Sequence, residues 1–115
     1  MTDLLSRLQS ASEGSAELDR DVLIACGWTD RGASRIAFRW IDPSGVLHAL
    51  DVMPTRSLDD ITGLIEQAGM RWYRFRITTG ARMVVESAEQ ECWSDHEDAC
   101  LALCISFRRA MEAGR

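Results

Sequence analysis

The chain has 115 residues, of which 46% are apolar and 27% charged, and it carries a formal net charge of −5. This length fits one domain, residues 1–115, which can bury a core without needing a metal or a disulfide. The acidic balance argues against general nucleic-acid binding, which draws most of its affinity from phosphate neutralisation, and no apolar run is long enough to predict a membrane span.

The cellular compartment is predicted from the N-terminus and the cysteines. The first residues, Met1-Thr2-Asp3-Leu4-Leu5, have no basic head or long apolar run, so they lack the pattern of a secretory signal. In a chain without such a signal, the four cysteines are more typical of free thiols than of disulfides. We therefore expect a protein of the reducing bacterial cytoplasm.

Two short helices are predicted at the N-terminus, over residues 3–12 and 16–26. Gly14 suits the end of the first helix, and Ser15 suits the N-cap of the second. Gly27 then ends the second helix and allows Trp28 to fold back onto its last turn.

Two hairpins, each followed by a helix, are predicted in the rest of the chain. Alternating apolar and polar side chains indicate strands over 34–41 and 71–78, with return strands over 46–52 and 82–88. In the second hairpin, Tyr73, Phe75 and Ile77 are expected to face inward on one strand, and Met83 and Val85 on the other.

The helices after the two hairpins have recognisable starts. Ser57 caps a helix over 58–68 that has a wide apolar stripe. The segment Ser94-Asp95-His96-Glu97 has the form of a capping box and predicts a last helix that runs to about Ala113.

These elements predict an α+β protein built as an α/β/α-layered sandwich, with two N-terminal helices followed by ββα-ββα. The four strands would form one mainly antiparallel sheet with the later helices on one face. The other face would carry Trp72 and Val84 among arginines, which is too apolar to be fully exposed. We therefore expect the N-terminal helices to cover it.

Three blocks of sequence support a family resemblance. They are Leu4-Leu5-Ser6-Arg7-Leu8 followed by Gly14-Ser15-Ala16-Glu17-Leu18-Asp19; Ser57-Leu58-Asp59 with Trp72 soon after; and Ala99-Cys100-Leu101-Ala102-Leu103-Cys104-Ile105 followed by Phe107-Arg108-Arg109-Ala110. In this order and spacing, the chain resembles the phage ABA sandwich domain family. The resemblance implies α/β/α layering and a phage or prophage origin, and it implies no particular activity. The acidic segment 94–98 departs from the family pattern, in which small residues and proline are common.

A recurrence of cysteine and histidine every four residues is the clearest candidate metal pattern. Cys92, His96, Cys100 and Cys104 would span about 18 Å on a continuous helix, too far to share one ion, so that at most His96 and Cys100 could do so, with Cys92 reaching in from the loop. His96 beside Cys100 could also be a base and a nucleophile, although no third orienting group is apparent. We interpret Cys100 and Cys104 as core residues and predict no metal, no cofactor and no catalytic residue.

Arginines are the only basic residues, and several fall on the predicted strands. Nucleic-acid or partner contact is a hypothesis for Arg35, Arg39, Trp72, Arg74 and Arg76, because arginine and aromatic rings on a sheet can bind phosphates and stack on bases. The favoured interpretation is that the arginines of 71–82 pair across strands with the acids of 86–98.

No P-loop, GxGxxG, GxSxG or HExxH motif is present. The leading functional hypothesis is a non-enzymatic accessory or protein-interaction module of a phage or prophage, with a homodimer as one form of interaction. Trp28 and Trp93 are the candidate exposed contact residues. The alternative is a nucleic-acid-binding accessory protein that uses the arginine face.

Overall fold

The computed structural model describes residues 3–31, 39–48, 52–77, 80–87 and 91–113. The protein is an α+β fold, as expected. Its elements in chain order are α1 (Leu4–Ser10), α2 (Ala16–Ala25), β1 (Thr29–Asp30), β2 (Trp40–Ile41), β3 (Leu47–His48), α3 (Leu58–Gln67), β4 (Arg71–Ile77), β5 (Gly80–Glu86), β6 (Glu91–Ser94) and α4 (Ala99–Ala113).

The ends of α2 and α3 form as their sequences predict. The hydroxyl oxygens of Ser15 and Ser57 accept hydrogen bonds from backbone N–H groups of the first turns, at 3.1 and 3.3 Å. Gly27, with φ +89°, ends α2, and the N–H of Trp28 donates to the carbonyl of Leu23 at 3.0 Å. This is a Schellman end, and it turns Trp28 back onto α2 as expected.

The start of α4 differs from the prediction. Ser94 is the last residue of β6, and the helix begins at Ala99. The N-cap is Asp98, whose carboxylate accepts from the N–H of Leu101 at 3.0 Å. The predicted capping box is wrong because residues 91–94 pair with β5, and strand pairing satisfies their backbone groups outside a helix.

The single four-stranded sheet that we expected is also not observed. The described strands form two antiparallel three-stranded sheets, in the orders β1-β2-β3 and β4-β5-β6. Each hairpin takes its third strand from a segment next to it in sequence, which the alternation pattern did not predict. Such local pairing closes shorter loops than joining the two hairpins across α3 would require.

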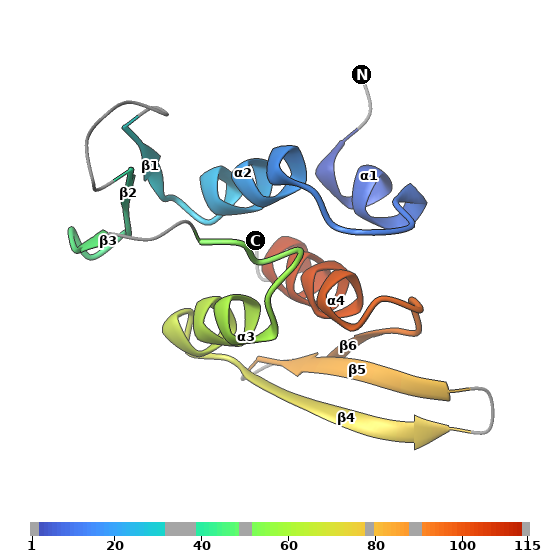
Figure 1. The fold of residues 1–115 in the computed structure, drawn as a ribbon. Coiled ribbons are helices and arrows are strands. Elements are labelled where there is room, and N and C mark those ends of the chain that lie inside the picture. Colours follow the sequence, from blue (N-terminus) through green and yellow to red (C-terminus); the bar gives the residue numbers. More distant parts are fainter. Residues whose placement is uncertain (1–2, 32–38, 49–51, 78–79, 88–90, 114–115) are drawn as a thin grey trace.

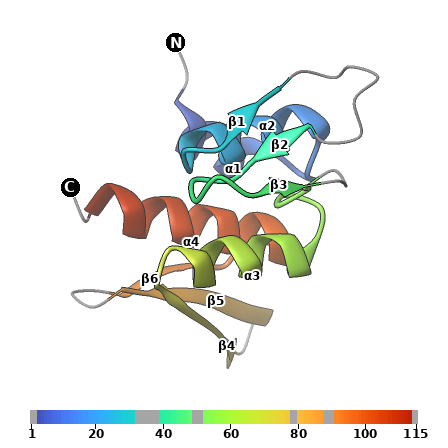
Figure 2. The same ribbon diagram turned by 90° about the vertical axis from the view of Figure 1, so that its left-hand side faces the viewer.

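The layers also differ from the α/β/α sandwich. Helices α3 and α4 lie in the middle of the molecule, with the β4–β6 sheet on one side and α1, α2 and the small β1–β3 sheet on the other (Figures 1 and 2). The N-terminal helices therefore pack against α4, and no helix of the described residues covers the other face of β4–β6. No helix in the described part of the chain is long and apolar enough to cross a bilayer.

The side of β4–β6 that meets the helices is set by the register. Met83 and Val85 face α4 and belong to the core, as expected. Val85 lies opposite Trp72, whereas Tyr73 lies opposite Val84. The expectation that Tyr73 shares the inner face is therefore wrong, because directly paired residues of antiparallel strands point to the same side.

Helix α4 is the centre of the core. Its residues from Leu101 to Phe107 are all buried, and the hydroxyl of Ser106 donates to the carbonyl of Met83 at 2.9 Å. The helix thus packs under α1 and α2 on one side and on β5 and β6 on the other. A helix that is apolar almost all round fits this central position.

Candidate functional site

The face of β4–β6 that points away from α3 and α4 is the candidate functional site, and we name it the outer face. No element of the described chain lies on it (Figures 1 and 2). It carries, from the three strands, the residues Arg71, Tyr73, Arg82, Val84, Glu86, Glu91 and Trp93.

A row of two aromatic side chains with a valine between them crosses the middle of the outer face. Tyr73, Val84 and Trp93 lie side by side on β4, β5 and β6. Val84 is only 1% exposed although it lies outside the helix-covered core, whereas 46% of Trp93 is exposed. The centre of the outer face is therefore apolar and closely packed, and the indole of Trp93 is open to contact.

Arg82 is held at one end of this row. Its guanidinium carbon lies 3.8 Å from the ring centroid of Trp93. Two of its N–H groups donate to the carboxylate of Asp95, at 2.8 and 3.1 Å. The hydrogen bonds from Arg82 lower the pKa of Asp95. The arrangement orients a cation over an indole, and Arg82 is one arginine of 71–82 that pairs with an acid of 86–98, as the favoured interpretation predicts.

The other end of the row is acidic. The hydroxyl of Tyr73 is 3.1 Å from a carboxylate oxygen of Glu86 and also hydrogen-bonds to Glu91. The pKa of Tyr73 is raised, mainly by the hydrogen bond to Glu91 and to a smaller extent by desolvation and by the hydrogen bond to Glu86. A phenol has one proton to donate, so two negative charges converge on a single donor. Composition alone could not reveal this pair, because it depends on β5 and β6 being neighbours.

The two predicted tryptophan contacts have different positions. Trp93 is exposed on the outer face, as expected. Trp28 is only 7% exposed, so the expectation of an exposed contact there is wrong. The Schellman end of α2 directs Trp28 inward, where its ring lies 4.6 Å from that of His48.

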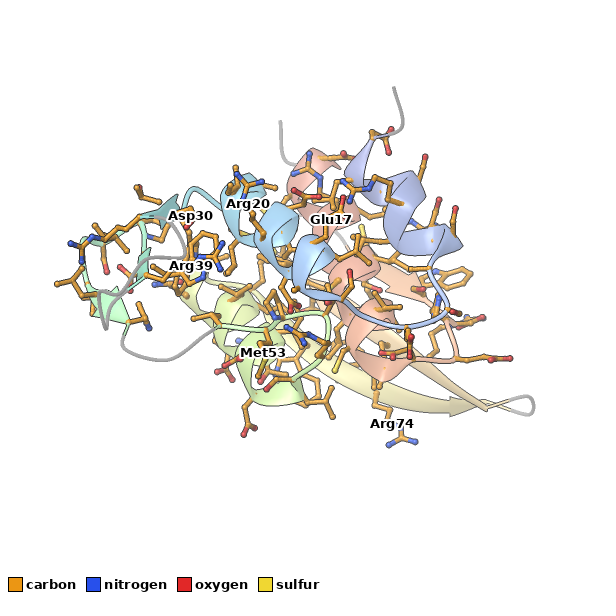
Figure 3. All side chains as sticks on the ribbon, turned by 45° about the horizontal axis from the view of Figure 1, so that its top comes forward. Glu17, Arg20, Asp30, Arg39, Met53 and Arg74 are labelled. Carbon is orange, nitrogen blue, oxygen red and sulfur yellow. The ribbon has the colours of Figure 1, made fainter. Side chains whose placement is uncertain are left out.

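The arginines proposed for nucleic-acid contact do not share one sheet. Arg39 lies beside the β1–β3 sheet and donates to both carboxylate oxygens of Asp30, at 2.9 and 3.1 Å. Arg74 projects from β4, far from Arg39 (Figure 3). By register, Trp72 and Arg74 share the helix-facing side of β4 with Val85 and Met83, not the outer face. Arg35 lies outside the described residues, as does the side chain of Arg76, whose backbone is part of β4.

The cysteine and histidine pattern is divided between structural roles. The Nε2 of His96 donates to the carbonyl of Ala11 at 2.7 Å, and its Nδ1 accepts from the N–H of Asp98 at 3.0 Å. Both ring nitrogens thus hold the backbone. The buried thiol of Cys104 lies 3.4 Å from the carbonyl of Pro54. Among the described residues, no three histidine, cysteine or acidic side chains are grouped as metal ligands would be.

The chain was compared with known proteins at three levels. No family model, no curated protein and no solved structure matches it.

Proposed function

We propose that this chain is a non-enzymatic accessory protein that acts by binding another protein through the outer face. We place it in the cytoplasm of a bacterial host, as the product of a phage or prophage gene, which the resemblance to phage ABA sandwich domains implies. The observation that carries the proposal is that the described helices cover only one side of the β4–β6 sheet, and that an exposed tryptophan on the edge strand β6 lies on the other side.

The residue types of the outer face favour protein binding. Tryptophan, tyrosine and arginine dominate the energetics of protein interfaces, because they bury large areas and keep a polar group for orientation. Here Arg82 and Trp93 are already stacked, and Arg82 is fixed by Asp95. A preoriented pair loses little side-chain entropy when a partner covers it.

Charge favours a basic partner. Glu86 and Glu91 contribute two carboxylates at one end of the outer face, where Arg71 lies opposite Glu86, and Arg82 is neutralised by Asp95, so that the charges of this face sum to a net negative value. A second copy of the chain would bring the same acidic end and a net charge of −5. Like charges slow encounter and weaken association, whereas a basic surface is attracted. A phosphate backbone would be repelled by the same two carboxylates.

The size of the outer face favours a transient complex. Strands of 7, 7 and 4 residues at about 3.4 Å per residue, set about 4.8 Å apart, give a three-stranded face of roughly 300 Å². Stable interfaces bury about 800 Å² per partner. We therefore expect moderate affinity, or a partner that also contacts neighbouring surface.

The state of the cysteines supports a function without nucleophilic catalysis. All four are free thiols. Burial raises the pKa of Cys26 to about 11, and burial also raises the pKa values of Cys100 and Cys104. A catalytic cysteine needs the opposite change, since the thiolate is the nucleophile.

The test is affinity capture by the tagged chain from nuclease-treated lysate of cells that encode it, followed by binding measurements with the purified captured protein. We expect a basic partner whose dissociation constant rises with salt. Glu86→Gln with Glu91→Gln should weaken binding at least ten-fold, because it removes charge and keeps the hydrogen-bond acceptors. Trp93→Ala should do the same, because it removes the most exposed aromatic contact of the outer face.

The matched control is Leu58→Ala, which removes an equally exposed apolar side chain from α3, at 46% for both residues. It should leave binding unchanged. The proposal would be overturned if both outer-face variants still captured the partner, or if capture depended on intact nucleic acid. It would also be overturned if light scattering showed a dimer that Trp93→Ala abolishes. A lysate that yields no specific partner would also count against it.

A further inference from the structure

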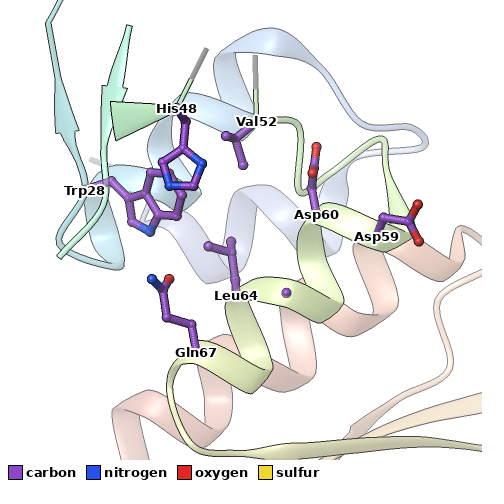
Figure 4. A pocket seen from close by; sticks show the side chains of 8 residues that line it. Trp28, His48, Val52, Asp59, Asp60, Leu64 and Gln67 are labelled. Atoms are coloured by element: carbon purple, nitrogen blue, oxygen red, sulfur yellow. The ribbon is translucent and has the colours of Figure 1, made fainter. Parts of the chain in front are cut away.

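A second site lies on the opposite side of the molecule from the outer face. A cleft of about 260 Å³ separates the β1–β3 sheet from α3, and its walls include Trp28, His48, Asp59, Asp60 and Gln67 (Figure 4). At about 30 Å³ per water, it has room for roughly nine water molecules. A molecule the size of a single amino acid would fill it.

The indole of Trp28 is the decisive group in the cleft. Its ring is only 7% exposed, and its Nε1 is buried without a hydrogen-bond partner. A buried unpaired N–H costs about 1–3 kcal/mol, and native structures rarely retain one without a reason. Figure 4 shows this nitrogen on the edge of the ring that faces the side-chain amide of Gln67. Gln67 is exposed, so it can turn aside and admit another acceptor.

The wall opposite α3 is held rigidly. The Nε2 of His48 lies 2.9 Å from the carboxylate of Asp42, and the same carboxylate accepts from the N–H groups of Ser44 and Val46 at 2.9 and 3.0 Å. These bonds close the turn between β2 and β3. They orient the imidazole against Trp28, and a side chain that is already oriented lowers the entropic cost of binding.

The α3 side of the cleft is acidic. Asp59 and Asp60 are in the first turn of α3, where carboxylates also favour the helix dipole. Asp60 accepts from the N–H of Met53 at 2.8 Å. Asp59 is exposed, and no arginine or histidine in the described part of the chain forms an ion pair with either. A cation in the cleft would therefore meet two uncompensated negative charges.

We propose that this cleft binds a small organic cation that also carries a carbonyl oxygen. The oxygen accepts the hydrogen bond from the indole N–H of Trp28, and the cationic group lies against Asp59 and Asp60. The site does not depend on the outer face, and its ligand is distinct from the protein partner proposed above.

A neighbouring hollow suggests where an apolar part of the ligand would go. It has a volume of about 230 Å³ and shares Trp28, Leu64 and Gln67 with the cleft, and it continues along Pro43, Phe107 and Met111. The shared residues place the Trp28 side chain where the two recesses meet. A ligand with an acceptor in its middle, a cation at one end and an apolar group at the other would match this order of surfaces.

The test uses argininamide as the probe and the indole N–H signals in a ¹H–¹⁵N NMR spectrum as the readout. The chain has four tryptophans, and Trp28→Phe identifies the Trp28 signal by its loss. We expect the Trp28 signal to move downfield and saturate, while the signal of Trp93 stays fixed. Agmatine, which lacks the carbonyl, and N-acetylglycinamide, which lacks the cation, should each bind at least ten-fold more weakly.

Gly63 offers a variant that blocks the cleft without disturbing the fold. It lines the cleft, and a Cβ built on it meets no atom within 4 Å. Gly63→Leu should abolish the shift, Gly63→Ala should retain it, and Asp59→Asn should weaken binding at least ten-fold. A Trp28 signal that does not move, a shift that never saturates, or equal shifts with Gly63→Leu would overturn the proposal. Equal binding of N-acetylglycinamide would overturn the assignment of a cation.

Discussion

The carboxylate of Asp19 in α2 holds Thr55, which precedes α3 by three residues. One carboxylate oxygen accepts from the N–H and the hydroxyl of Thr55, at 2.8 and 2.5 Å. The other lies 2.7 Å from the guanidinium of Arg56. Asp19 is 4% exposed and Thr55 is fully buried. This contact joins α2 to the segment that leads into α3. It therefore helps to fix the positions of α2 and α3 relative to α4.

We predict that Asp19→Ala destabilises the protein by about 2–3 kcal/mol, because it leaves the buried N–H of Thr55 without an acceptor and leaves its hydroxyl only the carbonyl of Ser15, at 3.2 Å. Urea unfolding measures the change in the free energy of unfolding. The control is Glu17→Ala in the same helix, whose side chain is 82% exposed, and it should change stability by less than about 0.5 kcal/mol. Equal effects of the two variants would contradict the role assigned to Asp19.

Two glycines should respond to alanine with opposite signs. A Cβ on Gly14 would lie 1.9 Å from the carbonyl oxygen of Thr55, so Gly14→Ala should cost about 1–3 kcal/mol through a forced backbone shift. A Cβ on Gly63 meets nothing within 4 Å, and Gly63→Ala inside α3 should stabilise by up to about 1 kcal/mol. Thermal unfolding of both variants checks the prediction, and a shared sign would refute it.

Stability should fall in acid because of Asp42. Hydrogen bonds from His48 and Ser44 lower the pKa of Asp42 in the folded protein. The unfolded chain, with an ordinary value of about 3.9, therefore takes up the proton first as the pH falls. The contribution of Asp42 is present above about pH 4 and is lost as the pH falls toward the folded pKa.

Asp42→Asn keeps one acceptor oxygen for the turn and removes this titration. The variant should be less stable at pH 7, and its stability should change less than that of the wild type between pH 5 and pH 2.5. Urea titrations at four pH values measure the two slopes. Parallel slopes for both proteins would exclude Asp42 as a source of the acid sensitivity.

The thiol of Cys26 should resist alkylation in the folded protein. Burial raises its pKa to about 11, so at pH 8 about 0.1% is thiolate, compared with about 10% for a thiol of pKa 9. Mass spectrometry of iodoacetamide-treated protein should show labelling about 100-fold slower at Cys26 than in the urea-unfolded chain. Equal rates in the two states would show that this thiol is accessible and ordinary.

Local chemistry explains most of what could be predicted about the fold. Ser15 and Ser57 cap helices, Gly27 ends one, and Arg71–Ile77 pairs with the strand that follows it, because each feature depends on residues close in sequence. The predictions that were wrong concern contacts between residues far apart in the sequence. The third strand of the β4–β6 sheet and the start of α4 at Ala99 depended on whether residues 91–94 would pair with β5 or join the helix.

The outer face shows the same division. Trp93 was identified as an exposed contact from sequence, but the Tyr73, Glu86 and Glu91 cluster was not, because three strands must be in register to bring these side chains together. Trp28 was assigned to the surface, and its burial depends on the β1–β3 sheet folding over it. Side chains that meet only across a sheet or a cleft leave no periodic signal along the chain.

The amino-acid sequence by itself determined the presence of the helices, the caps of α2 and α3 and the two hairpins, since hydrogen bonds within a few residues and apolar periodicity decide these elements. Only the tertiary structure decided that α4 lies between α1 and α2 on one side and β4–β6 on the other, and that one sheet face stays uncovered. Burial explains the difference. Several packings could bury the same apolar stripes. The free energy of the whole core, together with the hydrogen bonds between Asp19 and Thr55, selects among them.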